Sequence, residues 1–109
     1  MPSRSYRVGY HFEHNVVAPF FRGLGYFAIE SRGSHGLADI VAIPARDSFH
    51  YPQTPLLIQC KKGKHRPTSK LYDHLKENSK WNAEFLVAYG TGKNNLVIEN
   101  LDKKDMRFV

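Results

Sequence analysis

The segment Leu56-Leu57-Ile58-Gln59-Cys60 is apolar almost without interruption. A strand with one face in water alternates apolar and polar residues, whereas a strand covered on both faces does not need to alternate. We therefore expect a central strand over residues 56–60, with other elements packed on both of its sides. A chain of 109 residues has room for one such core, so we expect one domain, residues 1–109.

Two helices and four further strands are expected around this central strand. Residues 8–24 read as a helix whose apolar side chains recur every four positions, at Val8, Phe12, Val16, Phe20 and Leu24. Val17 and Phe21 join them on the adjoining face. Pro19 predicts a kink near its end. The second helix is expected to begin at Thr68 or Ser69, to end near Lys80, and to turn Leu71, Leu75 and Asn78 inward. Strands are expected over residues 26–31, 38–43, 85–89 and 96–101.

The resulting order, α β β β α β β, predicts an α/β fold in which helices cover a mixed five-stranded sheet. The stretch 45–55 contains two prolines and is expected to be an excursion between strands. Gly90-Thr91-Gly92-Lys93 superficially resembles a phosphate-binding loop. It lacks the length and the Gly-Lys-Ser/Thr ending of such a loop, so we expect a hairpin turn there.

Positive charge is concentrated in one part of the chain. There are 16 Lys and Arg against 10 Asp and Glu, for a net charge of +6. Seven of these cations, against two acids, lie between residues 61 and 80, beginning with Lys61-Lys62-Gly63-Lys64-His65-Arg66. Such a cluster favours binding to a phosphate backbone, because each neutralised phosphate releases counterions. A solvated surface loop is the alternative interpretation.

Several classes of protein are disfavoured by the sequence. No apolar run approaches the ~18 residues that a membrane-spanning helix needs. Met1-Pro2-Ser3-Arg4-Ser5 lacks the apolar stretch of a signal peptide. The one cysteine, Cys60, has no partner for an internal disulfide, which indicates a reducing, cytoplasmic location.

Polar residues interrupt the apolar segments at three places. Glu13 borders the inward stripe of the first helix, and Asp39 stands directly before Ile40-Val41-Ala42-Ile43. Gln59 and Lys61 are two residues apart at the end of the central strand, so they project from the same face. Carboxylate and amide oxygens suit a hard cation such as Mg²⁺, and a nearby ammonium suits a phosphate or its attacking water.

Three fragments of the sequence, taken in chain order, resemble the motifs of a known protein family. They are Phe12-Glu13-His14-Asn15-Val16, the run from Arg32-Gly33-Ser34-His35-Gly36 to Asp39-Ile40-Val41-Ala42-Ile43, and Leu57-Ile58-Gln59-Cys60-Lys61. Over residues 4–62 the chain resembles the PD-(D/E)xK nuclease superfamily, and within it the archaeal-type Holliday junction resolvases (Hjc-like). The resemblance implies a restriction-endonuclease-like fold and metal-dependent hydrolysis of DNA phosphodiesters. Two departures are Ala38 in place of the usual Pro and Gln59 in place of the usual Glu. Relatives resembling the Mrr-type restriction endonucleases also have Gln at the position of Gln59.

The resemblance also implies roles for individual residues. Asp39 would bind Mg²⁺, for which Mn²⁺ would substitute, with Glu13, the Gln59 side-chain oxygen and the Cys60 backbone carbonyl nearby. Lys61 would orient or deprotonate the attacking water, or stabilise charge in the transition state. Ser34 would contact the scissile region. A further set of residues would hold DNA: Arg4, Arg7, Arg32, His35, Lys62, Lys64 and Arg66. A two-fold homodimer would cut the two strands of a four-way junction symmetrically.

Other interpretations of the same residues stay open. Glu13 could be a solvated helix residue, Asp39 a cap, and Gln59 and Lys61 polar residues that end a strand. The Cys60 side chain alternates away from them, so we expect it to be a small buried apolar group rather than a nucleophile. His11 and His14 lack the second ligand pair of a zinc site. The alternative functions are a restriction-like (Mrr-type) nuclease acting on duplex DNA and a non-catalytic DNA-binding module, which the loss of the acid at position 59 would favour.

Overall fold

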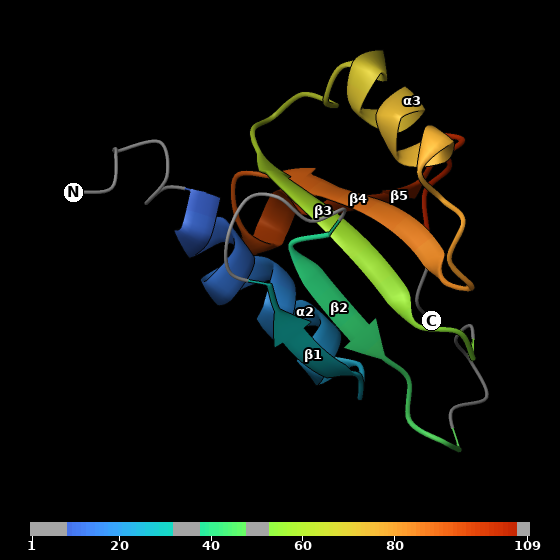
Figure 1. The fold of residues 1–109 in the computed structure, drawn as a ribbon. Helices are drawn as coiled ribbons and strands as arrows, with labels where there is room; N and C mark the ends of the chain where they lie inside the picture. Colours follow the sequence, from blue (N-terminus) through green and yellow to red (C-terminus); the bar gives the residue numbers. More distant parts are fainter. Residues whose placement is uncertain (1–8, 32–37, 48–52, 107–109) are drawn as a thin grey trace.

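A five-stranded mixed sheet lies between two helical layers in the computed structural model of the chain (Figure 1). The structure describes residues 9–31, 38–47 and 53–106. The strands are β1 (Phe27–Glu30), β2 (Ile40–Ile43), β3 (Leu56–Lys62), β4 (Glu84–Gly90) and β5 (Val97–Asn100). They lie side by side in chain order; β3 and β4 are parallel, and the other neighbours are antiparallel. The predicted order of elements and the mixed sheet are therefore confirmed.

Each face of the sheet packs against a different helix. The N-terminal helix covers one face, where Phe12, Val17 and Phe21 pack against side chains of all five strands, including Ala28, Ile40, Ile58, Leu86 and Ile98. The helix α3 (Ser69–Glu77) covers the other face with Tyr72 and Leu75, which pack against Phe85, Val87 and Tyr89 of β4. Among the described residues, no helix has the length and hydropathy needed to cross a membrane.

The most completely covered strand is β4 rather than β3. β3 occupies the middle of the sheet as predicted, and Leu56, Ile58 and Cys60 are buried under the N-terminal helix. Its other face is only partly covered, whereas β4 is buried from Phe85 to Gly90. The difference arises because α3 is centred on β4 and reaches β3 only at Leu57. The polar end of β3 is therefore left accessible.

The N-terminal helix contains a widened turn that the sequence pattern does not predict. Residues 9–23 are helical, but Glu13–Val17 form a π-turn, labelled η1, in which the amide of Ala18 bonds the carbonyl of Glu13. The helix then continues as α2 (Ala18–Gly23). Pro19 has no amide hydrogen and its ring crowds the carbonyl four residues back, and the wider turn just before it relieves that crowding.

This π-turn changes which side chains face the core. The four-residue repeat predicted that Phe20 would face inward with Phe12, yet Phe20 is 37% exposed. Val17 and Phe21, which the pattern placed on the adjoining face, are fully buried, and so is Ala18. The extra residue in the π-turn rotates the following positions about the helix axis, so the buried stripe moves on by one residue.

Smaller differences concern the boundaries. β3 continues two residues further than expected, to Lys62, because it pairs with β4 along its whole length. α3 ends at Glu77 and is preceded by Thr68 at the N-cap position. Leu75 is buried as predicted, whereas Leu71 and Asn78 are only partly buried and Tyr72 is the second buried side chain of this helix. The expected hairpin turn contains a single 3₁₀ turn, η2 (Lys93–Asn95).

Candidate active site

Asp39 is held across three strands of the sheet. Its backbone amide donates to the carbonyl of Ile58 at 2.8 Å, and its carbonyl accepts from the amide of Ser31 at 2.8 Å. Its carboxylate oxygen Oδ2 accepts from the amide of Cys60, also at 2.8 Å. These contacts fix both the backbone and the side chain of Asp39 at the edge where β2 begins and β3 approaches its end.

Gln59 and Lys61 lie next to Asp39 on β3. The antiparallel register pairs Ile40 with Ile58, so one step further places Asp39 beside Gln59. Gln59 is partly buried and Lys61 is exposed. Because alternate residues of a strand share a face, both project to the side opposite the buried Cys60. The strand therefore offers an amide oxygen and an ammonium group beside the fixed carboxylate.

Glu13, on the N-terminal helix, lies within electrostatic reach of Asp39 and Lys61. Its pKa is raised to about 7, first by burial and then by the negative charges of Asp39 and Glu30, while the positive charge of Lys61 opposes them. Burial also raises the pKa of Asp39, against the hydrogen bond from the Cys60 amide and the charge of Lys61. Glu13, Asp39 and Lys61 thus lie within electrostatic reach of one another, and their roles at a shared metal site stay predictions.

The carboxylates near Asp39 could hold a divalent cation only together with uncharged oxygen ligands. Two partly buried carboxylates, on Glu13 and Asp39, are the negative groups that would favour a cation. Among the described residues, no group of three or more His, Cys, Asp or Glu side chains is placed to hold a metal ion. Mg²⁺ keeps several waters and needs only one or two carboxylates, so these two groups suit it. A role of the Gln59 side chain as a further oxygen donor stays a prediction.

Glu30 is a further residue of this region, one that the sequence pattern did not single out. It ends β1, and both of its carboxylate oxygens lie within 3.0 Å of His14 Nδ1, while Arg22 Nη2 is 3.6 Å away. The ring of Tyr10 stacks on His14. These contacts tie the π-turn that carries Glu13 to the end of β1. The signal in the sequence is a carboxylate that ends an apolar strand, whereas Asp39 stands directly before one.

Cys60 behaves as expected. Its side chain is buried in the core beneath the N-terminal helix. Burial raises the pKa of the thiol well above its usual range, and the negative charges of Asp39 and Glu13 act in the same direction. A thiol held protonated in this way is a poor nucleophile, so the contribution of Cys60 to the site comes from its backbone.

The basic residues expected to hold DNA fall into two groups. Lys62 and Lys64 are exposed beside the candidate active site. Arg66 has a partner within the chain, since its Nε and Nη2 atoms donate to both carboxylate oxygens of Glu99. A role of Arg66 in phosphate binding stays a prediction. The other predicted contacts lie outside the described residues: Arg4, Arg7, Arg32, Ser34 and His35.

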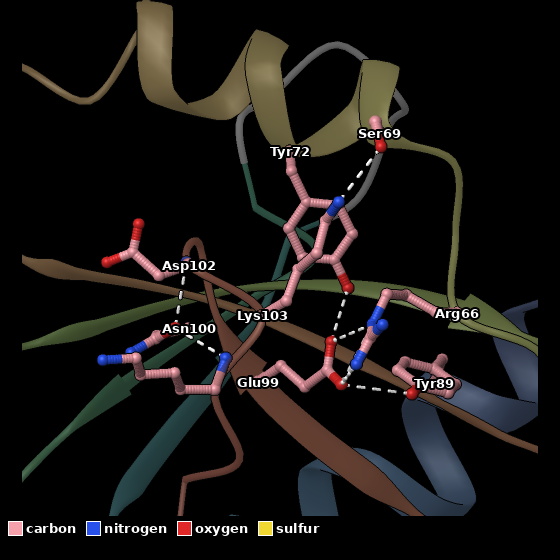
Figure 2. Close-up of polar contacts among 9 residues, drawn as sticks. Arg66, Ser69, Tyr72, Tyr89, Glu99, Asn100, Asp102 and Lys103 are labelled. Atoms are coloured by element: carbon pink, nitrogen blue, oxygen red, sulfur yellow. Dashed lines mark hydrogen bonds and ion pairs between the residues drawn. The ribbon is translucent and has the colours of Figure 1, made fainter.

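The Glu99 carboxylate is the centre of a second polar cluster, on the α3 side of the sheet (Figure 2). Besides Arg66, the hydroxyl groups of Tyr72 and Tyr89 donate to it, at 2.9 and 3.2 Å. The sequence pattern did not single out this residue either. Glu99 interrupts an apolar strand, Leu96 to Leu101, but its partners are 10 to 33 positions away in the sequence.

Comparison with solved structures shows which known folds this chain is similar to. No protein-family profile and no curated protein matches the chain. Among solved structures, Hjc of Archaeoglobus fulgidus, a Holliday junction resolvase from an archaeal hyperthermophile, superposes with a TM-score of 0.63. The match covers 86% of this chain and 73% of that one, at 22% sequence identity. The chain has a restriction-endonuclease-like fold. This fold was expected from the resemblance of the three sequence fragments.

Proposed function

We propose that this protein is a metal-dependent endonuclease that hydrolyses phosphodiesters in branched DNA and resolves Holliday junctions as a homodimer. The observation that carries the proposal is the convergence of Glu13, Asp39 and Lys61 from three separate elements. The likeness in fold to a resolvase supports it, as does the positive charge of the chain. A protein that only bound DNA would gain nothing from two carboxylates facing phosphates.

The residues of the site divide the work of hydrolysis. Glu13, Asp39, the Gln59 side-chain oxygen and the Cys60 carbonyl would hold Mg²⁺ or Mn²⁺, which would polarise the phosphate and lower the pKa of a bound water. Lys61 would orient or deprotonate that water or stabilise charge in the transition state. The Cys60 amide keeps Asp39 in one orientation through its hydrogen bond to Oδ2. Glu30 holds the turn that carries Glu13.

The DNA would be held mainly through its backbone. Lys62 and Lys64 are exposed next to Lys61 and would contact phosphates, which positions a duplex without reading its sequence. We assign the same role to Arg4, Arg7, Arg32 and His35, and contact with the scissile region to Ser34. A four-way junction is recognised by its shape, and two active sites related by a two-fold axis would cut it symmetrically.

Gln59 is the observation that favours a second candidate, a non-catalytic DNA-binding module. The usual Glu is replaced by an amide, which removes one formal negative charge from the site of Glu13 and Asp39. A weaker affinity for metal follows from that loss. Such a module would bind DNA with the same exposed lysines but would leave the phosphodiester intact.

One experiment separates these functions. A labelled four-way junction and a linear duplex of the same sequence are incubated with the protein, with and without Mg²⁺. We expect cleavage of the junction only, in the presence of the metal, with symmetric nicks. Equal cutting of both substrates would indicate a restriction-like duplex nuclease. Binding without cleavage at any concentration of Mg²⁺ or Mn²⁺ would favour the non-catalytic module.

A further inference from the structure

Glu99 is a buried carboxylate whose partners come from three different parts of the chain. Only 3% of the residue is exposed. It accepts hydrogen bonds from Arg66, which follows β3, from Tyr72 on α3, and from Tyr89 on β4 (Figure 2). A buried carboxylate is stable only when its oxygens are hydrogen-bonded and its charge is balanced. The three partners therefore fix one another in a single arrangement.

Arg66 is the residue through which this cluster reaches the surface. Its guanidinium binds Glu99 in a two-pronged geometry, with distances of 2.9 Å from Nε to Oε2 and 2.7 Å from Nη2 to Oε1. Bidentate pairs of this kind define orientation as well as distance. The side chain of Arg66 is still 46% exposed, so it lies at the rim between the buried Glu99 and solvent.

The basic segment 61–66 is attached to the sheet at two points. At its start, β3 pairs with β4 as far as Lys62, and the amide of Gly63 donates to the carbonyl of Gly90 at 2.8 Å. At its end, Arg66 is bound to Glu99. Between these two points lie Lys64 and His65, both exposed. Two residues held between two fixed ends have little freedom to move.

We infer that Glu99 is a positioning residue for nucleic-acid binding: through Arg66 it holds Lys64 and His65 in place as a preformed phosphate-binding edge beside Lys61 and Lys62. This inference rests on the proposed function, since it concerns the same DNA. A segment whose backbone is already held loses less conformational freedom on binding, and this difference increases affinity. Glu99 cannot contact the DNA itself, because it is buried.

The variant Glu99→Gln tests the inference because two explanations predict changes of opposite sign. It raises the net charge by one, so charge alone predicts tighter binding to DNA. Loss of the Arg66 anchor predicts weaker binding, by about three- to tenfold, as the segment becomes mobile. The slope of log affinity against log salt should stay unchanged, because the number of phosphate contacts is the same. The measurement is fluorescence anisotropy of a labelled four-way junction in EDTA, which prevents cleavage.

Two further variants complete the test. Glu77→Gln makes the same change of charge at an exposed position at the end of α3, and we expect it to bind DNA at least as tightly as the wild type. Tyr72→Phe keeps the charge and removes one donor to Glu99, and we expect a smaller loss of affinity in the same direction. Circular dichroism establishes that each variant is folded, and Tyr72→Phe decides the outcome if Glu99→Gln does not fold.

The outcomes separate the inference from the function on which it rests. A wild-type protein that binds no DNA overturns both. If the wild type binds but the folded Glu99→Gln variant binds as tightly or more tightly, the positioning role of Glu99 is wrong and the proposed function stands. A variant that is less stable but binds normally also overturns the positioning role, because it shows that the cluster is purely structural.

Discussion

Asp39 shows at the level of a single residue how the fold prepares a group for chemistry. Its carboxylate accepts a hydrogen bond from the Cys60 amide, so its orientation does not depend on a bound ion. Replacing Asp39 by Asn removes the charge but keeps an oxygen that can accept this bond. We expect Asp39→Asn to remove cleavage, by at least about a thousandfold, while DNA binding is kept or strengthened because a repelling charge is gone.

Asp47→Asn is the matched control for Asp39→Asn. It makes the same change of charge at an exposed position beyond the opposite end of β2. We expect it to cleave a labelled four-way junction at the wild-type rate. Cleavage by Asp39→Asn at a comparable rate would mean that Asp39 is not a metal ligand.

Gln59 offers a prediction in the opposite direction. Glu at this position would add a negative charge beside Asp39, and a third carboxylate strengthens binding of a hard cation. We expect Gln59→Glu to reach half-maximal cleavage at a lower concentration of Mg²⁺ than the wild type. The check is a metal titration of the initial cleavage rate, and an unchanged titration would show that Gln59 does not bind the ion.

Glu99 should make the free energy of unfolding depend on pH in the acidic range. Burial acts to raise its pKa, but hydrogen bonds from Arg66, Tyr72 and Tyr89 outweigh burial and lower the pKa below 4.5. A carboxyl group whose pKa is lower in the folded state stabilises the protein above pH 4.5. This contribution is lost as the pH falls through the pKa of the folded state. We expect the free energy of unfolding of Glu99→Gln to fall less steeply below pH 4.5 than that of the wild type. Urea unfolding at a series of pH values measures both slopes, and parallel slopes would contradict the assignment.

At the level of the elements, the turn that joins β4 to β5 depends on Gly90. Its φ is +143°, a conformation that residues with a side chain rarely adopt. A Cβ there would also press on the backbone carbonyl oxygen of Asn95 and lie 3.1 Å from the Cα of Leu96. We expect Gly90→Ala to lower the free energy of unfolding by about 2–4 kcal/mol. Urea denaturation measures the change.

Gly92→Ala controls for the loss of a glycine in the same turn. Its backbone is extended, with φ −179°, and a Cβ there would meet nothing within 4 Å. We expect it to be about as stable as the wild type. Equal destabilisation by both variants would show that the turn resists any added side chain and that the conformation of Gly90 is not the cause.

The order of the elements could be predicted from the sequence, but the helix positions that face the core could not. Apolar runs such as Ile40–Ile43 mark strands wherever the chain is buried, and that pattern predicted the α/β order. The π-turn before Pro19 shifted the buried face of the helix by one residue, and a repeat of four makes no allowance for an inserted residue. The partners of Glu30 and Glu99 were equally hidden, because they come together only when distant elements pack.

For the whole molecule, the decisive property is that charge of both signs gathers at one end of the sheet. β3 and β4 are parallel, so Lys62 and Gly90 lie side by side where both strands end. β2 runs antiparallel to β3, which brings its first residues, and Asp39 just before them, to this same end. The carboxylates, Lys61 and the basic segment are therefore neighbours, although they are distant in the sequence.

The position of a positive charge should matter more than its number if this end of the sheet receives the DNA. Lys64 lies at this end, whereas Lys80, beside Trp81, precedes the start of β4 at the opposite end. Lys64→Ala and Lys80→Ala lower the net charge equally. We expect Lys64→Ala to weaken binding to every DNA and to reduce the salt slope by about one unit, because one phosphate contact is lost. Lys80→Ala should leave the slope as it is. Anisotropy titrations at several salt concentrations distinguish the two, and equal slopes would remove the basic segment from the interface.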